Sequence, residues 1–357
     1  MGPLAVELDR CGGIECVICL TGQHREMLMQ AMEPFSVKCR YNLDIMKNRQ
    51  NLTSITAAVL EGMESVLEKE EPDLVLVHGD TTTSFAAAVS AFYKKIPVGH
   101  IEAGLRTGDR YSPYPEEQNR ILTDHISTYL FAPTGKNEEN LSREGIKSHV
   151  YVTGNTVIDS FQYTVRENYQ FHNQVLQELD CERIVLLTAH RRENLGQPLR
   201  NICFAIKRLA KEYKDTGFVY PVHLNPDVRE TVYEILSGEK NIHLIDPIDV
   251  LDMHNLIARS FLLLTDSGGL QEEAPHFGKP VLVLRSETER PEAVEAGTVK
   301  VVGTEEEVIY FETKRLFDHE NDYISMANAI NPYGDGHASE RIVKLISDGF
   351  VASPGSL

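Results

Sequence analysis

The stretch Thr265-Asp266-Ser267-Gly268-Gly269-Leu270-Gln271-Glu272-Glu273-Ala274-Pro275 follows directly on the apolar run Phe261-Leu262-Leu263-Leu264. This pattern predicts a buried strand that ends in a tight turn, because glycines permit close backbone approach or a positive φ. A helix then opens, and its free N–H groups suit an anion such as phosphate. Glu273 would reach a ribose if that phosphate belonged to a nucleotide. A simpler interpretation is a helix capped by the side chain of Asp266 or Ser267.

The chain has 357 residues and a formal net charge of −18. Its length suggests two domains of ordinary size. The acidic excess argues against a surface for nucleic acid or anionic membranes, since both need a basic face. The N-terminus has no signal-peptide pattern, and no apolar run approaches the roughly 20 residues that span a bilayer. We therefore expect a cytoplasmic protein.

Six cysteines are unevenly spread, and Cys16 and Cys19 form a C-x-x-C pair. Such a pair could be a redox site or half of a zinc site. It lies inside the apolar run Ile14–Leu20, where a strand would point the two thiols to opposite faces, and no second pair follows. We favour buried structural thiols, which fit a reducing compartment.

Apolar, β-rich runs alternate with helical patterns along the whole chain. The expected strands of the first half are Ile14–Leu20, Leu74–His78, Pro97–Glu102, Tyr129–Ala132 and Val150–Thr153. Those of the second half are Arg183–Thr188, Phe218–His223, Ile242–Ile245, Phe261–Thr265, Pro280–Leu284 and Val299–Val302. This alternation predicts parallel sheets with helices on both faces. The expected fold class is α/β, with two doubly wound, Rossmann-like domains facing a cleft.

Two segments mark the expected domain boundaries. Residues 156–180 are polar and helix-rich without a core strand, so we place the linker there. Asn331–Gly336 breaks the second domain before a final helix, which we expect to return to the first domain. The predicted division is residues 1–160 plus 333–357 for the N-terminal domain and residues 161–332 for the C-terminal domain.

Carboxylates gather at the expected strand ends of the first half, where ligands of such sheets bind. They are Asp80, Glu102 and Glu116, with Glu117 beside the last. Clustered carboxylates shift one another's pKa, so an acid and a base can coexist for proton transfer to and from carbon. Asp80 and Glu116 could instead be first-turn helix residues favoured by the helix dipole. No Asp-x-Asp pair occurs here, and we expect no metal.

Positive charge in the second half follows two expected strands. His190-Arg191-Arg192 comes after one strand, and Arg290 comes after another. The forked donors of arginine suit phosphate. These could also be surface arginines paired with Glu193 and Glu289. Taken with Ser267-Gly268-Gly269, they predict a diphosphate pocket.

Several long motifs in this order resemble those of one bacterial family. They are His78-Gly79-Asp80-Thr81-Thr82-Thr83, His100-Ile101-Glu102-Ala103-Gly104-Leu105-Arg106-Thr107, Tyr111-Ser112-Pro113-Tyr114-Pro115-Glu116-Glu117, Thr188-Ala189-His190-Arg191-Arg192-Glu193-Asn194 and the stretches around Ser267 and Arg290. Over nearly the whole chain the sequence resembles the non-hydrolysing UDP-N-acetylglucosamine 2-epimerases. The resemblance implies a GT-B-like fold with the carboxylates in the N-terminal domain and UDP held by the C-terminal domain.

The resemblance also implies a reaction. UDP-GlcNAc and UDP-ManNAc interconvert by anti elimination of UDP to a 2-acetamidoglucal and re-addition of UDP, which supplies ManNAc for cell-surface polysaccharide. Asp80, Glu102 and Glu116 match the acid/base carboxylates, and His190 matches a histidine near the pyrophosphate. The implied substrate-binding residues are Ser267, Gly268, Gly269, Glu273, Arg290 and Arg120. The resemblance implies neither a metal nor a nicotinamide cofactor.

Some relatives bind a second UDP-GlcNAc as an allosteric activator. The matching residues here are Gln23, Arg49, Glu116, Arg191 and His223. Glu26 stands where those relatives usually carry Gln, and its charge could repel the second ligand. The resemblance further implies a homodimer.

The start of the sequence departs from the family pattern. Met1 to Leu8 resembles the middle of the family's first helix, so the first strand and its Gly-Thr-Arg-Pro-Glu loop are missing. On this basis we expect weak or no turnover. Three alternatives stay open: a hydrolysing epimerase, a GT-B glycosyltransferase, and a UDP-sugar-binding remnant without catalysis.

Overall fold

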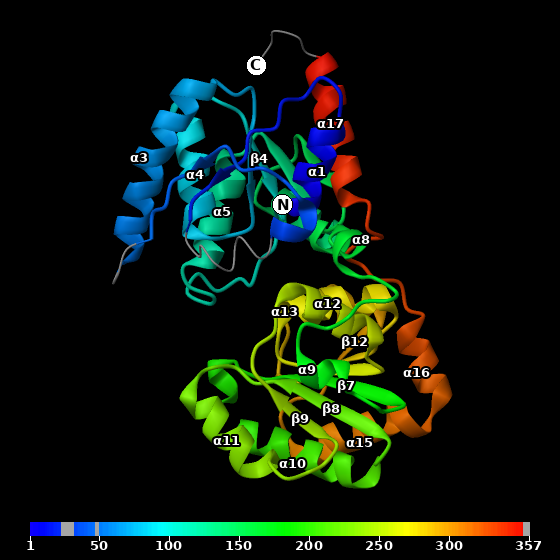
Figure 1. Cartoon of the computed structure of the whole chain (residues 1–357). Coiled ribbons are helices and arrows are strands. Elements are labelled where there is room, and N and C mark those ends of the chain that lie inside the picture. The colour runs from blue at the N-terminus through cyan, green and yellow to red at the C-terminus, as the bar shows by residue number, and fades with distance from the viewer. Residues whose placement is uncertain (23–31, 47–49, 353–357) are drawn as a thin grey trace. The chain divides into compact units, whose positions relative to one another are not determined.

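The computed structural model describes residues 1–22, 32–46 and 50–352. The chain divides into two compact units, Met1–Tyr163 with Tyr333–Leu357, and Thr164–Pro332 (Figure 1). Three residues named above, Gln23, Glu26 and Arg49, lie outside the described residues.

The first unit contains a four-stranded parallel sheet in the order β3-β4-β5-β6 and a separate parallel pair, β1 and β2. Its elements are α1 (Gly2–Arg10), β1 (Cys19–Leu20), η1 (Glu33–Phe35), β2 (Tyr41–Asn42), α3 (Leu52–Glu70), β3 (Val75–His78), α4 (Thr82–Tyr93), β4 (Val98–Ile101), α5 (Glu116–Ile126), β5 (Tyr129–Ala132), α6 (Gly135–Arg143), β6 (Val150–Val152), α7 (Thr156–Asp159), α8 (Phe161–Thr164) and α17 (Ala338–Ala352). Helices α3, α4 and α5 lie on one side of β4, and α1 and α17 lie side by side on the other (Figure 1).

Alternation along the strands explains the two cores of this unit. Val98 of β4 packs with α3 and α4, whereas Ile101 packs with α1 and α17. All four residues of β4 are buried, as expected of a strand covered on both faces. Helix α3 begins at a capping box in which the side chain of Asn51 accepts from the backbone N–H of Ser54.

The second unit contains one six-stranded sheet of parallel pairs in the order β12-β11-β10-β7-β8-β9. Its elements are α9 (Gln174–Gln177), β7 (Arg183–Thr188), η2 (Arg192–Asn194), α10 (Gln197–Glu212), β8 (Thr216–Pro221), α11 (Pro226–Leu236), β9 (Ile242–Ile245), α12 (Val250–Arg259), β10 (Leu262–Thr265), α13 (Gly268–Glu273), η3 (Ala274–Phe277), β11 (Val281–Val283), α14 (Pro291–Ala296), β12 (Val299–Val301), α15 (Glu306–Asp318) and α16 (Glu320–Ala327). The apolar run that opened the sequence analysis is β10, which is fully buried between β7 and β11.

Most expected strands are found with ends shifted by one or two residues, but one expectation is wrong in extent. Of the run Ile14–Leu20, only Cys19–Leu20 forms a strand, paired with Tyr41–Asn42. A strand needs a partner, and this partner spans two residues. The cysteines of this run are partly rather than fully buried, and all six in the chain are free. Burial raises the pKa of the Cys16 and Cys19 thiols, as expected of structural cysteines.

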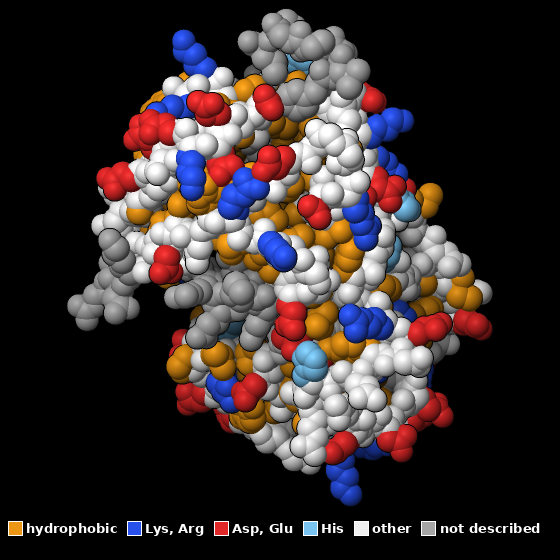
Figure 2. Space-filling model, turned by 45° about the horizontal axis from the view of Figure 1, so that its top comes forward, with side chains coloured by type: hydrophobic (Ala, Val, Ile, Leu, Met, Phe, Trp, Pro, Cys, Tyr) orange, Lys and Arg blue, Asp and Glu red, His pale blue; other side chains and the backbone are white. Residues whose placement is uncertain are grey.

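Two surface properties bear on the classes of function considered above. In the part of the chain that the structure describes, no helix is both long and apolar enough to cross a membrane. On the face drawn in Figure 2, acidic and basic side chains are interspersed over the coloured surface.

Candidate active site

Two of the candidate carboxylates leave the same edge of the first unit's sheet. Strands β3 and β4 pair in parallel with His78 opposite Ile101, and Asp80 and Glu102 follow them closely. The turn is tight: Gly79 has φ +67°, and Glu102 has φ +69°, which is unusual for a residue with a side chain. A Cβ atom on Gly79 would lie 2.9 Å from Glu102 Oε2. The Glu102 carboxylate therefore packs directly against the backbone that carries Asp80.

Helix α5 contributes the other residues of this group. Asn119 Nδ2 donates to the backbone carbonyl of Asp80 at 2.9 Å, and Arg120 forms an ion pair with the Asp80 carboxylate. Glu116 stands three and four residues earlier, so it lies on the same helix face. Arg120 is buried, and its Nε has no hydrogen-bond partner among the described residues.

The structure separates Glu116 from its neighbour Glu117, which the sequence could not do. Glu117 is 1% exposed, and its carboxylate accepts from the backbone N–H groups of Thr107 and Gly108 at 3.1 Å. That carboxylate holds the loop before α5. Glu116 is half-buried at the first position of the helix, and it stays a candidate for the acid/base role.

In the second unit, Asp266 organises the loop that carries the candidate histidine. Its Oδ2 accepts from the backbone N–H groups of His190 and Arg191, both at 2.8 Å, and its Oδ1 lies 3.3 Å from His190 Nδ1. Ser267 is the N-cap of α13 but makes no side-chain cap hydrogen bond. The simpler interpretation, a side-chain cap by Asp266 or Ser267, is therefore wrong. Asp266 is instead used by the end of the neighbouring strand β7.

Cationic and imidazole groups converge on the glycine turn. A Cβ atom on Gly268 would lie 3.6 Å from Arg290 Nη2 and 3.9 Å from Arg191 Nη2. The rings of His190 and His223 stack with centroids 5.3 Å apart. Arg191 and His223, which the resemblance assigns to a second ligand, thus lie in the same group as the residues it assigns to UDP.

Two residues of this group were not found as site residues from the sequence. Glu289 Oε1 lies 3.4 Å from nitrogens of both Arg191 and Arg285, and Glu289 Oε2 lies 3.7 Å from Arg290. Burial alone would raise the pKa of Glu289, but the three arginines hold it below its ordinary value. Arg285 also pairs with Glu193 at 2.7 Å. The arginines are thus already arranged around an oxyanion, here a carboxylate of the chain itself.

Glu273 differs from these paired charges, because burial and not an arginine dominates its pKa. Burial, with a smaller contribution from Glu272, raises the pKa of Glu273 to about 7. His254 Nε2 lies 3.8 Å from Glu273 Oε2, and burial lowers the pKa of His254 to about 4, so it provides no positive charge. A Cβ atom on Gly269 would lie 3.2 Å from Glu273 Oε1, so Gly269 leaves room for that carboxylate. The contact between Glu273 and His254 is a further feature that the sequence did not reveal.

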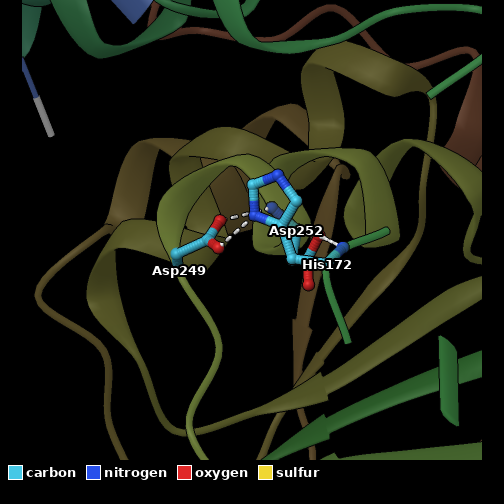
Figure 3. A group of neighbouring side chains, drawn as sticks. All are labelled: His172, Asp249 and Asp252. Carbon is cyan, nitrogen blue, oxygen red and sulfur yellow. Dashed lines mark hydrogen bonds and ion pairs between the residues drawn. The ribbon is translucent and has the colours of Figure 1, made fainter. Parts of the chain in front are cut away.

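Among the described residues, one group has the composition and spacing of potential metal ligands, and it includes none of the residues discussed above. It consists of His172, Asp249 and Asp252 (Figure 3). Asp252 accepts from the backbone N–H of His172 at 2.8 Å and of Asn173 at 2.9 Å, and from the Tyr169 hydroxyl at 2.8 Å. Asp249 caps α12 and contacts His172 Nδ1 at 2.7 Å. These hydrogen bonds already engage the carboxylates, and they fasten residues 169–173 to the start of α12.

Comparison with known proteins shows which family the sequence resembles. Residues 6–347 match the family model described as UDP-N-acetylglucosamine 2-epimerase. The UDP-N-acetylglucosamine 2-epimerase of Bacillus subtilis is 51% identical over 345 residues, covering 96% of this chain and 90% of the relative. The enzyme of the same name from Escherichia coli is 48% identical over 361 residues, covering 99% and 96%.

A solved structure agrees with these sequence relatives. The UDP-GlcNAc 2-epimerase of Neisseria meningitidis bound to UDP-GlcNAc superposes with a TM-score of 0.88 at 48% identity, covering 98% of this chain and 96% of that one. The α/β, GT-B-like fold class expected from the sequence is confirmed.

Proposed function

This chain belongs to the UDP-N-acetylglucosamine 2-epimerase family, so it has the function of a UDP-GlcNAc 2-epimerase, and we propose that it acts by the non-hydrolysing route. UDP-GlcNAc and UDP-ManNAc interconvert, with UDP retained until it is added back. No free sugar is released in this proposal.

The chemistry proceeds in two balanced steps. A carboxylate removes the C2 proton, the C1–O bond breaks, and UDP departs as the C1=C2 double bond of 2-acetamidoglucal forms. In the second step an acid returns a proton to the opposite face of C2, and a UDP oxygen bonds to C1 again. Both steps need acid/base groups close to one carbon, which fits general acid–base catalysis by carboxylates.

The observation that carries the proposal is the pairing of Asp80 and Glu102 at adjacent strand ends. Removing a proton from one face of C2 and returning one to the other requires more than a single base. Asp80 and Glu102 are held against one tight turn, and Glu116 lies on the face of α5 that contacts Asp80. These carboxylates provide such groups. Arg120 forms an ion pair with Asp80 and so holds that carboxylate in place.

In this proposal the second unit holds UDP. Arg290 and Arg191 bind the diphosphate beside Gly268, and the Ser267 hydroxyl, which caps nothing, donates to a phosphate oxygen. Glu273 accepts from the ribose hydroxyls. Glu289 marks the position of an oxyanion among the arginines, and the diphosphate replaces it there.

We assign Arg191 and His223 to this same nucleotide rather than to a second one, because both lie with His190 and Gly268. Isothermal titration with UDP-GlcNAc tests this assignment. One nucleotide per chain agrees with it. Two nucleotides per chain would instead support an allosteric activator site.

Proton NMR of the purified protein with UDP-GlcNAc in D₂O tests the reaction. We expect loss of the C2 proton signal together with the appearance of UDP-ManNAc and no free ManNAc. Free ManNAc would select a hydrolysing epimerase. Sugar transfer to an acceptor without C2 exchange would select a glycosyltransferase. Saturable binding with no exchange would leave a UDP-sugar-binding protein without catalysis.

A further inference from the structure

A buried pair of ionisable residues lies directly behind the carboxylate turn. His100 of β4 is 0% exposed and Asp124 of α5 is 1% exposed. His100 Nδ1 lies 2.6 Å from Asp124 Oδ1, and His100 Nε2 lies 2.8 Å from the backbone carbonyl oxygen of Gly79. Neither residue has a role in the reaction proposed above.

The contact with Gly79 defines one donor of the imidazole ring. A carbonyl oxygen can only accept, so His100 Nε2 must carry a hydrogen to make this bond. The contact between Nδ1 and the Asp124 carboxylate holds the other side of the ring. Burial alone would raise the pKa of Asp124, but His100 and Arg106 hold it below its ordinary value.

Other charged or titratable groups face the pair. Arg106 Nη2 lies 2.7 Å from Asp124 Oδ2 and also pairs with Glu144. Burial lowers the pKa of His78 well below its ordinary value, with smaller contributions from the chain's amino group, His100 and Arg120. Asp124 is thus held from two sides, by His100 and by Arg106.

The pair is bonded to both loops that carry candidate catalytic carboxylates. His100 donates to the Gly79 carbonyl, which immediately precedes Asp80. Asp124 Oδ2 accepts from the backbone N–H of Gly104 at 3.2 Å, two residues after Glu102. Gly79 and Glu102 both have left-handed backbone conformations, and such a conformation at Glu102 persists only where its surroundings hold it.

We propose that His100 and Asp124 are positioning residues that fix the spacing of Asp80 and Glu102 for proton transfer at C2. The inference rests on the proposed function, because it names the groups that hold that function's carboxylates. It assigns no contact between the pair and the substrate. The sensitivity of catalysis to small displacements of reacting groups gives such a pair a direct effect on rate.

Two substitutions of His100 separate positioning from simple stability. In H100Q the amide nitrogen stands near the former Nε2 and still donates to the Gly79 carbonyl. In H100N it stands near the former Nδ1, so it still donates to Asp124 but leaves that carbonyl without its donor. Both variants replace the ring by the same uncharged amide group, so they differ chiefly in where that amide stands. His125→Gln on the exposed side of α5 is the control.

We expect H100N to lose about 100-fold in kcat and H100Q about 10-fold, with KM for UDP-GlcNAc changed less than about threefold in both. Both melting temperatures fall by similar amounts, and the control keeps wild-type kcat. Equal losses of kcat in the two variants, or wild-type kcat in H100N, would overturn the inference.

An NMR measurement is independent of turnover. Two-bond ¹H–¹⁵N spectra of the ¹⁵N-histidine-labelled full chain, assigned with H100Q, report both ring nitrogens of His100. We expect Nε2 to carry a hydrogen, as donation to the Gly79 carbonyl requires, and an unprotonated Nε2 overturns the inference. If the wild-type chain shows neither C2 exchange nor UDP-ManNAc, the proposed function fails. In that case the hydrogen on Nε2 alone decides whether His100 holds the Gly79 carbonyl as inferred.

Discussion

The carboxylate group of the first unit and the arginine group of the second are held in different ways. In the first, buried side chains bond to backbone atoms, as His100 does to Gly79 and Glu117 does to Thr107. In the second, Asp266 also bonds to the backbone of Arg191, but the arginine side chains themselves pair with a half-buried carboxylate, that of Glu289. Bonds to the backbone fix positions, whereas ion pairs between side chains can exchange one oxyanion for another.

Because of this difference, we expect mutations in the two groups to affect different quantities. Changes in the first group should lower kcat, because they remove or displace groups that act in the transition state. Changes in the second should weaken substrate binding, because they remove contacts that substrate and transition state share.

The largest effect is expected for Asp80→Asn. The change keeps the size of the side chain but removes an acid/base group, so we expect kcat to fall by about 1,000-fold while the Kd of UDP-GlcNAc changes less than about threefold. Steady-state kinetics measures kcat, and isothermal titration measures Kd. The control variant is Glu138→Gln, at an exposed residue of α6. A raised Kd at unchanged kcat would show that Asp80 binds the substrate and does not act in proton transfer. The contrast between the carboxylate group and the arginine group would then be lost.

Arg290→Lys should have the opposite signature. Lysine keeps the charge beside the buried Glu272 but loses the forked donors, so we expect the Kd of UDP to rise about 30-fold and kcat at saturation to change little. The exposed Arg143→Lys of α6 is the matched control. If the melting temperature fell while UDP affinity stayed the same, Arg290 would be a structural partner of Glu272 alone.

A smaller effect is expected for Ser267→Ala. Because the Ser267 hydroxyl makes no cap hydrogen bond, its loss should leave the melting temperature unchanged and weaken UDP binding about 10-fold. Calorimetry and titration measure these two quantities, and the exposed Ser237→Ala provides the control. Lower stability with unchanged affinity would restore a capping role.

The smallest effect concerns pH and Glu273, whose pKa is about 7 in the folded protein. Below that pH the carboxyl is protonated, and above it the carboxylate can accept from both ribose hydroxyls. We therefore expect the affinity for UDP-GlcNAc to rise about threefold between about pH 6 and pH 8, and Glu273→Gln to remove this dependence. The same slope in the variant would assign the pH dependence to another group.

The same group gives a stability profile with a defined sign. The folded pKa of Glu273 lies above the ordinary value of 4.5, so between these values the folded chain holds a proton that the unfolded chain has lost. The contribution of Glu273 to stability therefore falls as pH rises from about 4.5 to 7 and is constant above that. Comparing urea midpoints of the wild type and Glu273→Gln across this range isolates the effect.

The sequence by itself determined the fold class and most of the strands. Short apolar runs such as Leu262–Thr265 and Val98–Ile101 are bounded by turns and alternate with helical patterns, and those signals are local. The family was also readable from the order of its motifs. The extent of Ile14–Leu20 was not, because strand length depends on the partner, and the partner here is short.

Only the tertiary structure decided what individual polar residues do. Asp266 holds the loop after β7 instead of capping its own helix, because β10 and β7 are neighbours in the sheet. Glu117 holds a loop, Glu116 does not, and His100 meets Asp124 across a strand and a helix. Such contacts depend on strand order and on which helix face is turned inward. Neither is encoded in the spacing of the residues along the chain, since hydrogen bonds at strand ends join segments far apart in sequence.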